Sequence, residues 1–190
     1  MGSEMCIRDS LSQAEHDEAA ASVLVTTSES LATEVDAALT NRLNRTKHST
    51  RARTALGGQQ SGIVLVSSLE EAAKFANSYA TEHLELQVQN PEKLMVQISN
   101  AGALFLGPFS PVSLGDYVAG SNHVLPTNQQ AKFGAGLSVH TFLRSQQVVD
   151  YNQAALAETF KFVDALANEE GLPAHFEACL LFTSPSPRDS

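Results

Sequence analysis

Pairs of residues that could bind a metal or move a proton occur at four places in this chain. They are Gln13 with His16, Glu82 with His83, Asp116 with His123, and Glu170 with His175. Residues three apart lie on one face of a helix, so Gln13 and His16 can chelate one ion if their segment is helical. Each pair taken alone is also an ordinary surface or helix-end feature, so the four pairs are candidates.

The surroundings of these pairs suggest different roles. Neighbouring residues on an extended segment point to opposite sides, so Glu82 and His83 can have different roles. A carboxylate can act as a base for water, and an imidazole can shuttle protons near neutral pH. Asp116 and His123 lie in a Gly- and Pro-rich stretch after a predicted strand. Ligands of open α/β sheets gather beyond the carboxyl ends of strands, so both side chains can reach one site.

Strand and helix patterns alternate along most of the chain. The predicted strands cover residues 22–26, 62–66, 84–88 and 103–106. The predicted helices cover 28–56 (capped by Ser28 or Ser30), 68–79, 90–98, 151–168 and a short segment after Pro173, with mostly loop at 108–136. This order predicts an α/β fold with an open, mostly parallel sheet and flanking helices, followed by a small C-terminal helical appendage. No G-x-G-x-x-G motif is present, so the sequence shows no dinucleotide fingerprint of its own.

The two ends differ from the rest. Residues 1–10 and 183–190 both end in Arg-Asp-Ser, lack regular patterning and resemble translated sequencing-adapter sequence. We therefore expect two non-native tails around a catalytic domain at 11–150 and a helical appendage at 151–182.

Composition excludes several classes of protein. The formal net charge is −9, opposite in sign to that of a general nucleic-acid binder, and the arginines and lysine between Arg42 and Arg53 are interpreted as a solvated helix face. Two distant cysteines, Cys6 and Cys179, cannot form a disulfide framework or a four-cysteine zinc site. No apolar run approaches the roughly 20 residues needed to span a membrane. We expect a cytoplasmic protein that binds neither nucleic acid nor membrane.

Three motifs resemble segments of histidinol dehydrogenase and occur in the same order as in that family. Along the chain they are LSQAEH at 11–16, AGALFLGP at 101–108 and GDYVAGSNHVLPT at 115–127. The resemblance continues through Glu82-His83-Leu84 to Ala174-His175 and covers nearly everything between the two unusual ends.

The resemblance implies an incomplete Rossmann-like domain from an enzyme that oxidises L-histidinol to L-histidine with two NAD⁺, the final step of histidine biosynthesis. It implies zinc bound by Gln13, His16, Asp116 and His175. It assigns Glu82 and His83 as the acid–base pair and places His123 and Glu170 at the substrate, which the zinc ligands and His83 also contact. It also implies a homodimer in which the tail histidine comes from the partner chain.

Family members are much longer, and the part expected to hold most NAD contacts is absent here. We therefore expect the isolated chain to be inactive, and the sequence identifies no cofactor-binding residues. Two alternatives stay open. One is a related dehydrogenase for another small alcohol, and the other is a non-catalytic zinc-binding or dimerisation module.

Overall fold

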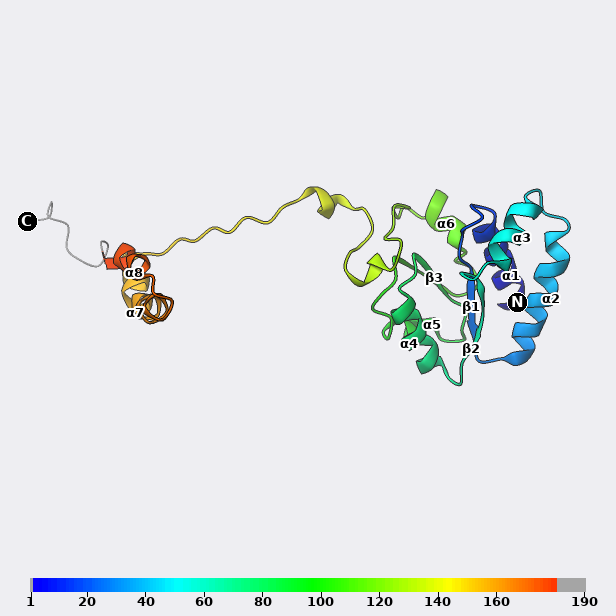
Figure 1. Ribbon diagram of the computed structural model, residues 1–190, viewed down its shortest axis with the longest axis horizontal. Helices are drawn as coiled ribbons and strands as arrows, with labels where there is room; N and C mark the ends of the chain where they lie inside the picture. The colour runs from blue at the N-terminus through cyan, green and yellow to red at the C-terminus, as the bar shows by residue number, and fades with distance from the viewer. Residues whose placement is uncertain (1, 181–190) are drawn as a thin grey trace, which may run out of the picture. The chain divides into compact units, whose positions relative to one another are not determined.

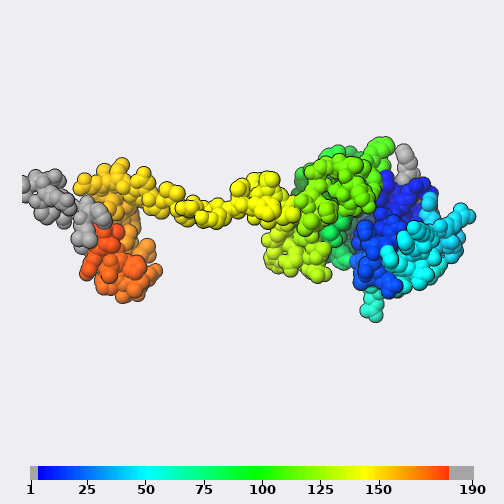
Figure 2. All heavy atoms as spheres, turned by 90° about the horizontal axis from the view of Figure 1, so that it is seen from above, coloured from blue at the N-terminus to red at the C-terminus, as the bar shows by residue number. Residues whose placement is uncertain are grey.

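A computed structural model describes residues 2–180 of the 190-residue chain. These residues belong to two compact units, one ending at Leu143 and one beginning at Arg144 (Figure 1 and Figure 2). Helices and strands alternate in the first unit, whereas the second contains helices. The predicted α/β class with C-terminal helices is confirmed. No helix between residues 2 and 180 is long and apolar enough to cross a membrane. The predicted tail at 183–190 lies outside the described residues.

The strands of the described residues form two parallel pairs. β1 (Val23–Thr26) pairs with β2 (Gly62–Leu65), and β3 (His83–Leu86) pairs with β4 (Ala103–Leu106). The predicted strands and their parallel direction are confirmed. β2 is only partly buried, and Leu65 at its end is 55% exposed. The expected sheet is thus present as two separate two-stranded parts.

The amino-terminal stretch is helical, which the sequence did not indicate. α1 spans Gly2–Ala14, and Ile7 on this helix is only 4% exposed. The Glu4 carboxylate accepts hydrogen bonds from Arg8 (3.3 Å) and from Arg42 of the following helix (2.7 Å). Packing against a neighbour therefore stabilises a helix that has no amphipathic period of its own. The foreign origin of residues 1–10 stays a prediction.

The predicted single helix at 28–56 is wrong. The chain forms α2 (Glu29–Leu43) and α3 (Ser49–Gly57), separated by a turn. Leu43 and the α3 residues Ala52 and Ala55 pack into one buried cluster around Ala14 of α1. A continuous straight helix would carry its last two turns away from α1, so burial of these side chains favours the break.

The second strand pair packs against two helices. α4 (Leu69–Tyr79) and α5 (Pro91–Met95) contribute Ala73 and Leu94 to a cluster with Leu86 of β3. The Ser68 hydroxyl accepts the Glu71 N–H at 3.2 Å and caps α4. Ala80 is the C-terminal cap of α4 and adopts φ +52, just before the Glu82-His83 pair.

The expected loop at 108–136 contains regular structure. α6 spans Val112–Tyr117, and the short 3₁₀ turn η1 spans Gln130–Lys132. A second 3₁₀ turn, η2 at Val139–Phe142, follows just after this stretch. Asp116 therefore lies on a helix, which is a correction to its predicted place in a loop.

The second unit consists of α7 (Gln153–Glu169) and α8 (Pro173–Leu180). Asn152 caps α7 by accepting the Ala155 N–H at 2.9 Å. The chain reverses at Gly171, whose φ of +71 suits a residue without a β-carbon. Phe160 and Phe176 stack across the two helices with 6.2 Å between ring centroids. Both predicted C-terminal helices are thus confirmed.

Candidate active site

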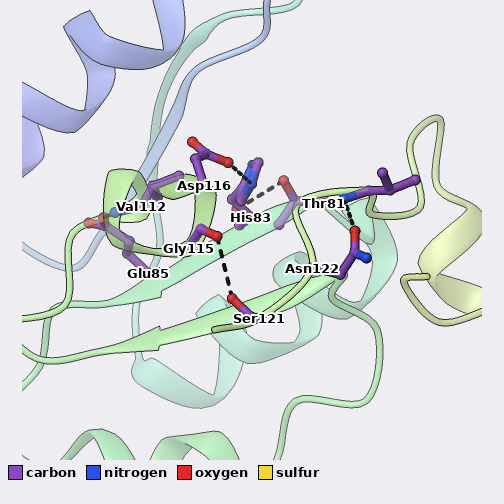
Figure 3. A network of polar contacts seen from close by, with 9 residues as sticks. Thr81, His83, Glu85, Val112, Gly115, Asp116, Ser121 and Asn122 are labelled. Atoms are coloured by element: carbon purple, nitrogen blue, oxygen red, sulfur yellow. Dashed lines mark hydrogen bonds and ion pairs between the residues drawn. The ribbon is translucent and has the colours of Figure 1, made fainter. Parts of the chain in front are cut away.

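His83 and Asp116 form the central contact of the candidate site. The Nε2 atom of His83, at the start of β3, lies 3.9 Å from Oδ1 of Asp116 on α6 (Figure 3). The two side chains are 17% and 28% exposed, so both are partly shielded and still reachable. The His83 ring also packs on Phe105 of β4, with 5.9 Å between centroids. The imidazole is thereby held between an aromatic ring and a carboxylate.

Gly115 explains how α6 comes so close to β4. A β-carbon at this position would lie 2.7 Å from Cζ of Phe105, which is well inside normal contact distance. The backbone N–H of Val112, at the first turn of α6, also donates to Oε1 of Glu85 at 3.1 Å. The absent side chain and this hydrogen bond together place Asp116 beside His83.

Gly102 has a similar role beside Glu82. A β-carbon there would lie 2.5 Å from the Glu82 carbonyl oxygen and 3.1 Å from Cδ of Pro126. The Gly102 N–H donates to the Thr81 carbonyl at 2.9 Å, and the Thr81 hydroxyl donates to the His83 carbonyl at 3.2 Å. Close backbone packing therefore positions the Glu82-His83 segment, and it explains one glycine and one proline of the sequence motifs, Gly102 and Pro126.

The acid–base candidates line a cavity of about 430 Å³ in the first unit. Glu82 and His83 lie on its wall, and so does Gln13 from α1. The structure thus brings one predicted zinc ligand and both predicted acid–base residues to the same cavity. Asp116 is joined to this group through its contact with His83.

His16 and His123 are both exposed. His16 follows the end of α1, and its N–H donates to the Gln13 carbonyl at 3.3 Å. His123 lies in the loop after α6, where the Asn122 side chain accepts the Val124 N–H at 2.8 Å (Figure 3). Among residues 2–180, no three His, Cys, Asp or Glu side chains gather closely enough to hold a metal. The predicted ligand set stays a prediction.

Glu170 and His175 belong to the second unit. Glu170 is the C-terminal cap of α7, His175 lies in α8, and both side chains are exposed. Their carboxylate and imidazole are accessible to a ligand.

A half-buried carboxyl pair, Asp9 and Glu85, lies next to the site and escaped the sequence reasoning. The pKa of Glu85 is raised to about 7, most of all by burial and then by charge repulsion from the nearby Asp9 carboxyl group and hydrogen bonding with it. Burial likewise raises the pKa of Asp9, whose Oδ2 atom is buried without a hydrogen-bond partner among the described residues. The alternating pattern at 84–88 gives no sign that the Glu85 carboxyl group is shielded from water, and Asp9 lies in the stretch set aside as a tail, so neither signalled the pair.

Known proteins resemble this chain over nearly its whole length. The family model described as histidinol dehydrogenase matches residues 2–181. A histidinol dehydrogenase from Leifsonia xyli subsp. xyli is 53% identical over 91% of this chain, and one from Mycobacterium tuberculosis is 55% identical over 90%. The crystal structure of histidinol dehydrogenase from Elizabethkingia anophelis is 33% identical, with a TM-score of 0.89 over 95% of this chain. The chain spans only 40%, 38% and 41% of these three proteins, respectively.

Proposed function

Because the chain belongs to the histidinol dehydrogenase family, we propose that it is the portion of such an enzyme that carries the zinc ligands and the acid–base pair. The reaction is the NAD⁺-dependent oxidation of L-histidinol to L-histidine in the cytoplasm. The observation that carries this proposal is the 3.9 Å contact between Asp116 and His83, a residue that lines the same cavity as Glu82.

The proposed metal site consists of Gln13, His16, Asp116 and His175. These side chains offer amide, imidazole and carboxylate donors, and such nitrogen and oxygen ligands suit zinc. The first unit contains the first three and the second unit contains His175, which we propose comes from the partner subunit of a homodimer. Bound zinc would orient the substrate and polarise its oxygen.

Glu82 and His83 move the protons in this proposal. In the first oxidation the alcohol loses a hydride to one NAD⁺ and its hydroxyl proton to one of these two side chains. Water then adds to the aldehyde, with Glu82 taking a proton from the attacking water and His83 relaying protons. The hydrate loses a second hydride to another NAD⁺ and a hydroxyl proton to one of the same two side chains, and becomes the carboxylic acid. Asp116 orients the His83 ring for these transfers.

Glu170 and His123 bind the substrate in this proposal. The Glu170 carboxylate is suited to pair with the cationic amine of histidinol through a charge-assisted hydrogen bond. This favours histidinol over a neutral alcohol. We propose that the NAD⁺ contacts lie in the part of the relatives that this chain does not span, so that the chain alone does not turn over.

A chimera tests the proposal. The matched segment of the Mycobacterium tuberculosis relative is replaced by this chain, and NADH formation from L-histidinol is compared with that of the chain alone. We expect activity in the chimera and none in the chain. In the chimera, His83→Gln should lower kcat by roughly 10²–10⁴-fold, the usual contribution of a general base. Turnover by the chain alone, or a chimera unaffected by His83→Gln, would contradict the proposal.

Native mass measurements distinguish an enzyme part from a non-catalytic zinc module. Wild-type chain is compared with Gln13→Ala and His175→Ala in the presence of zinc. Loss of zinc in both variants supports the ligand set. If this chain forms a zinc-bound dimer but the chimera does not oxidise histidinol, the non-catalytic zinc-binding module is favoured instead.

A further inference from the structure

Glu82 is held in the candidate site through its main chain. The residue lies on the cavity wall, and its carboxylate forms no hydrogen bond or ion pair with another group among residues 2–180. Its carbonyl oxygen, by contrast, accepts the Ala103 N–H at 2.9 Å. The position of the proposed base therefore depends on whatever fixes the backbone at residues 81–83.

The residues at the start of β4 fix that backbone. Gly102, just before Ala103, donates its N–H to the Thr81 carbonyl at 2.9 Å. A β-carbon on Gly102 would lie 2.5 Å from the Glu82 carbonyl oxygen, so the two backbones are already in contact. A shift of the segment that leads into Gly102 is consequently passed directly to Glu82.

The side chain of Asn77 holds that segment. Residues 96–100 belong to no helix or strand, so their backbone groups need other hydrogen-bond partners. The Oδ1 atom of Asn77 accepts the N–H groups of Ser99 and Asn100, at 2.8 and 3.2 Å. Its Nδ2 atom donates to the Gln97 carbonyl at 2.8 Å. One side chain thus satisfies three backbone groups of the loop before β4.

The contact is reciprocal and rests on a firm support. The Asn100 side-chain amide donates to the Asn77 carbonyl at 2.9 Å. That carbonyl is one of the last four of α4, which have no partner within the helix. One turn earlier on α4, Ala73 is only 4% exposed and packs in the cluster with Leu86 and Leu94. Four hydrogen bonds therefore tie the loop to a helix that is itself anchored in the core.

We propose that Asn77 is a positioning residue for Glu82. It joins the end of α4 to the loop before β4, and these are the two segments that lead into Glu82 and Gly102. The junction keeps the Glu82 backbone in place, and with it the carboxylate that takes a proton from the attacking water. Asn77 itself touches neither water nor substrate in this scheme. The inference rests on the proposed role of Glu82 as the base.

Amide hydrogen exchange in this chain tests the structural half of the proposal without catalysis. Asn77→Ala should speed exchange at Ser99, which loses its acceptor, and also at Gly102 and Ala103. The expected factor is about three- to tenfold, the range for one net hydrogen bond. Faster exchange at Ser99 alone overturns the proposal, because the change then does not reach Glu82.

Kinetics of the chimera with the Mycobacterium tuberculosis relative test the other half. Asn77→Ala should lower kcat by roughly ten- to a hundredfold, the effect of misplacing a reacting group by about 1 Å. The KM for L-histidinol should not change, because Glu82 is not among the residues proposed to bind substrate. In a Glu82→Gln background, Asn77→Ala should lower kcat no further, because its effect passes through that carboxylate. Equal effects in the two backgrounds overturn the proposal.

Two further variants control for the fold. Asn100→Ala removes only one of the four hydrogen bonds, so it should act in the same direction more weakly, and it replaces Asn77→Ala if that variant does not fold. Asn44→Ala removes an amide whose Oδ1 atom accepts an Arg53 hydrogen bond at 3.0 Å, at the end of a helix without proposed site residues. It should leave kcat unchanged. A loss of kcat with Asn44→Ala equal to that with Asn77→Ala would reduce the role of Asn77 to general stability.

His83→Gln separates this inference from the proposed function. If His83→Gln lowers the kcat of the chimera and Asn77→Ala does not, only the positioning role fails. If the chimera is inactive, the proposed function is contradicted, and exchange at Gly102 still decides whether Asn77 holds the Glu82 backbone.

Discussion

Gly115 lies so close to the Phe105 ring that a single added methyl group would fall 2.7 Å from Cζ. This contact decides how near α6 approaches β4, and hence how near the Asp116 carboxylate comes to His83. A residue with no side chain thus contributes to the candidate site through the space it leaves.

The first prediction follows from that contact. Gly115→Ala should destabilise the chain by about 1–3 kcal/mol, the usual cost of overpacking, and should separate Asp116 from His83. Urea unfolding measures the first effect. Zinc content of the chimera measures the second, because a displaced ligand weakens the site. Gly134→Ala is the control, since its nearest neighbour to an added methyl group is a backbone oxygen at 4.0 Å. Equal stability of the two variants would contradict the prediction.

The second prediction concerns Asp116 as a zinc ligand. Asp116→Asn should lower the zinc affinity of the chimera, because a neutral amide oxygen attracts a dication less than a carboxylate does. Metal analysis after dialysis against a competing chelator measures the loss. Asp36→Asn removes the same charge from the exposed face of α2 and should leave zinc content unchanged. Identical zinc content in both variants would remove Asp116 from the ligand set.

The third prediction is a dependence of stability on pH. The pKa of Glu85 is raised from 4.5 to about 7 in the folded chain, first by burial and then by Asp9. Between these values the folded state holds more protons than the unfolded state, so the free energy of unfolding should fall as pH rises from about 4.5 to 7.

Glu85→Gln tests this dependence, because the amide has no titratable proton and can still accept the Val112 N–H. The urea midpoint of the variant should decline less over the same pH range than that of the wild type. A wild-type urea midpoint that rises through this pH range would show that titration of the Asp9–Glu85 pair does not control the pH dependence of stability.

The fourth prediction separates two serines that the sequence left as equal candidates for capping α2. The Ser28 hydroxyl accepts the Leu31 N–H at 3.2 Å, so Ser28 is the cap. Ser28→Ala should cost about 1 kcal/mol of stability, the usual value of a lost cap. Ser30→Ala should cost less, because its hydroxyl contacts only Ser28 at 3.2 Å among the described residues. Thermal unfolding of the two variants measures the difference, and the reverse order would assign the cap to Ser30.

Local chemistry was enough to predict most elements of the fold. Ser68 and Pro91 mark the starts of α4 and α5, and β-branched or alternating runs mark the strands. These signals depend on neighbours in sequence, which is why the sequence alone reveals them. The motif around Gly115 and Asp116 also pointed to the family, because its length makes coincidence improbable.

Long-range packing decided the remainder. α1 and the turn between α2 and α3 exist because Leu43 and Ala52 are buried around Ala14, a contact with no local signature. The Asp9–Glu85 pair forms where a helix meets a strand, and local patterns do not report the burial that raises its pKa values. The pairing of β1 with β2 and of β3 with β4 likewise joins segments far apart in the chain. Sequence determined the chemistry that is available, and tertiary structure decided which groups meet, because burial and strand pairing join residues far apart in the chain.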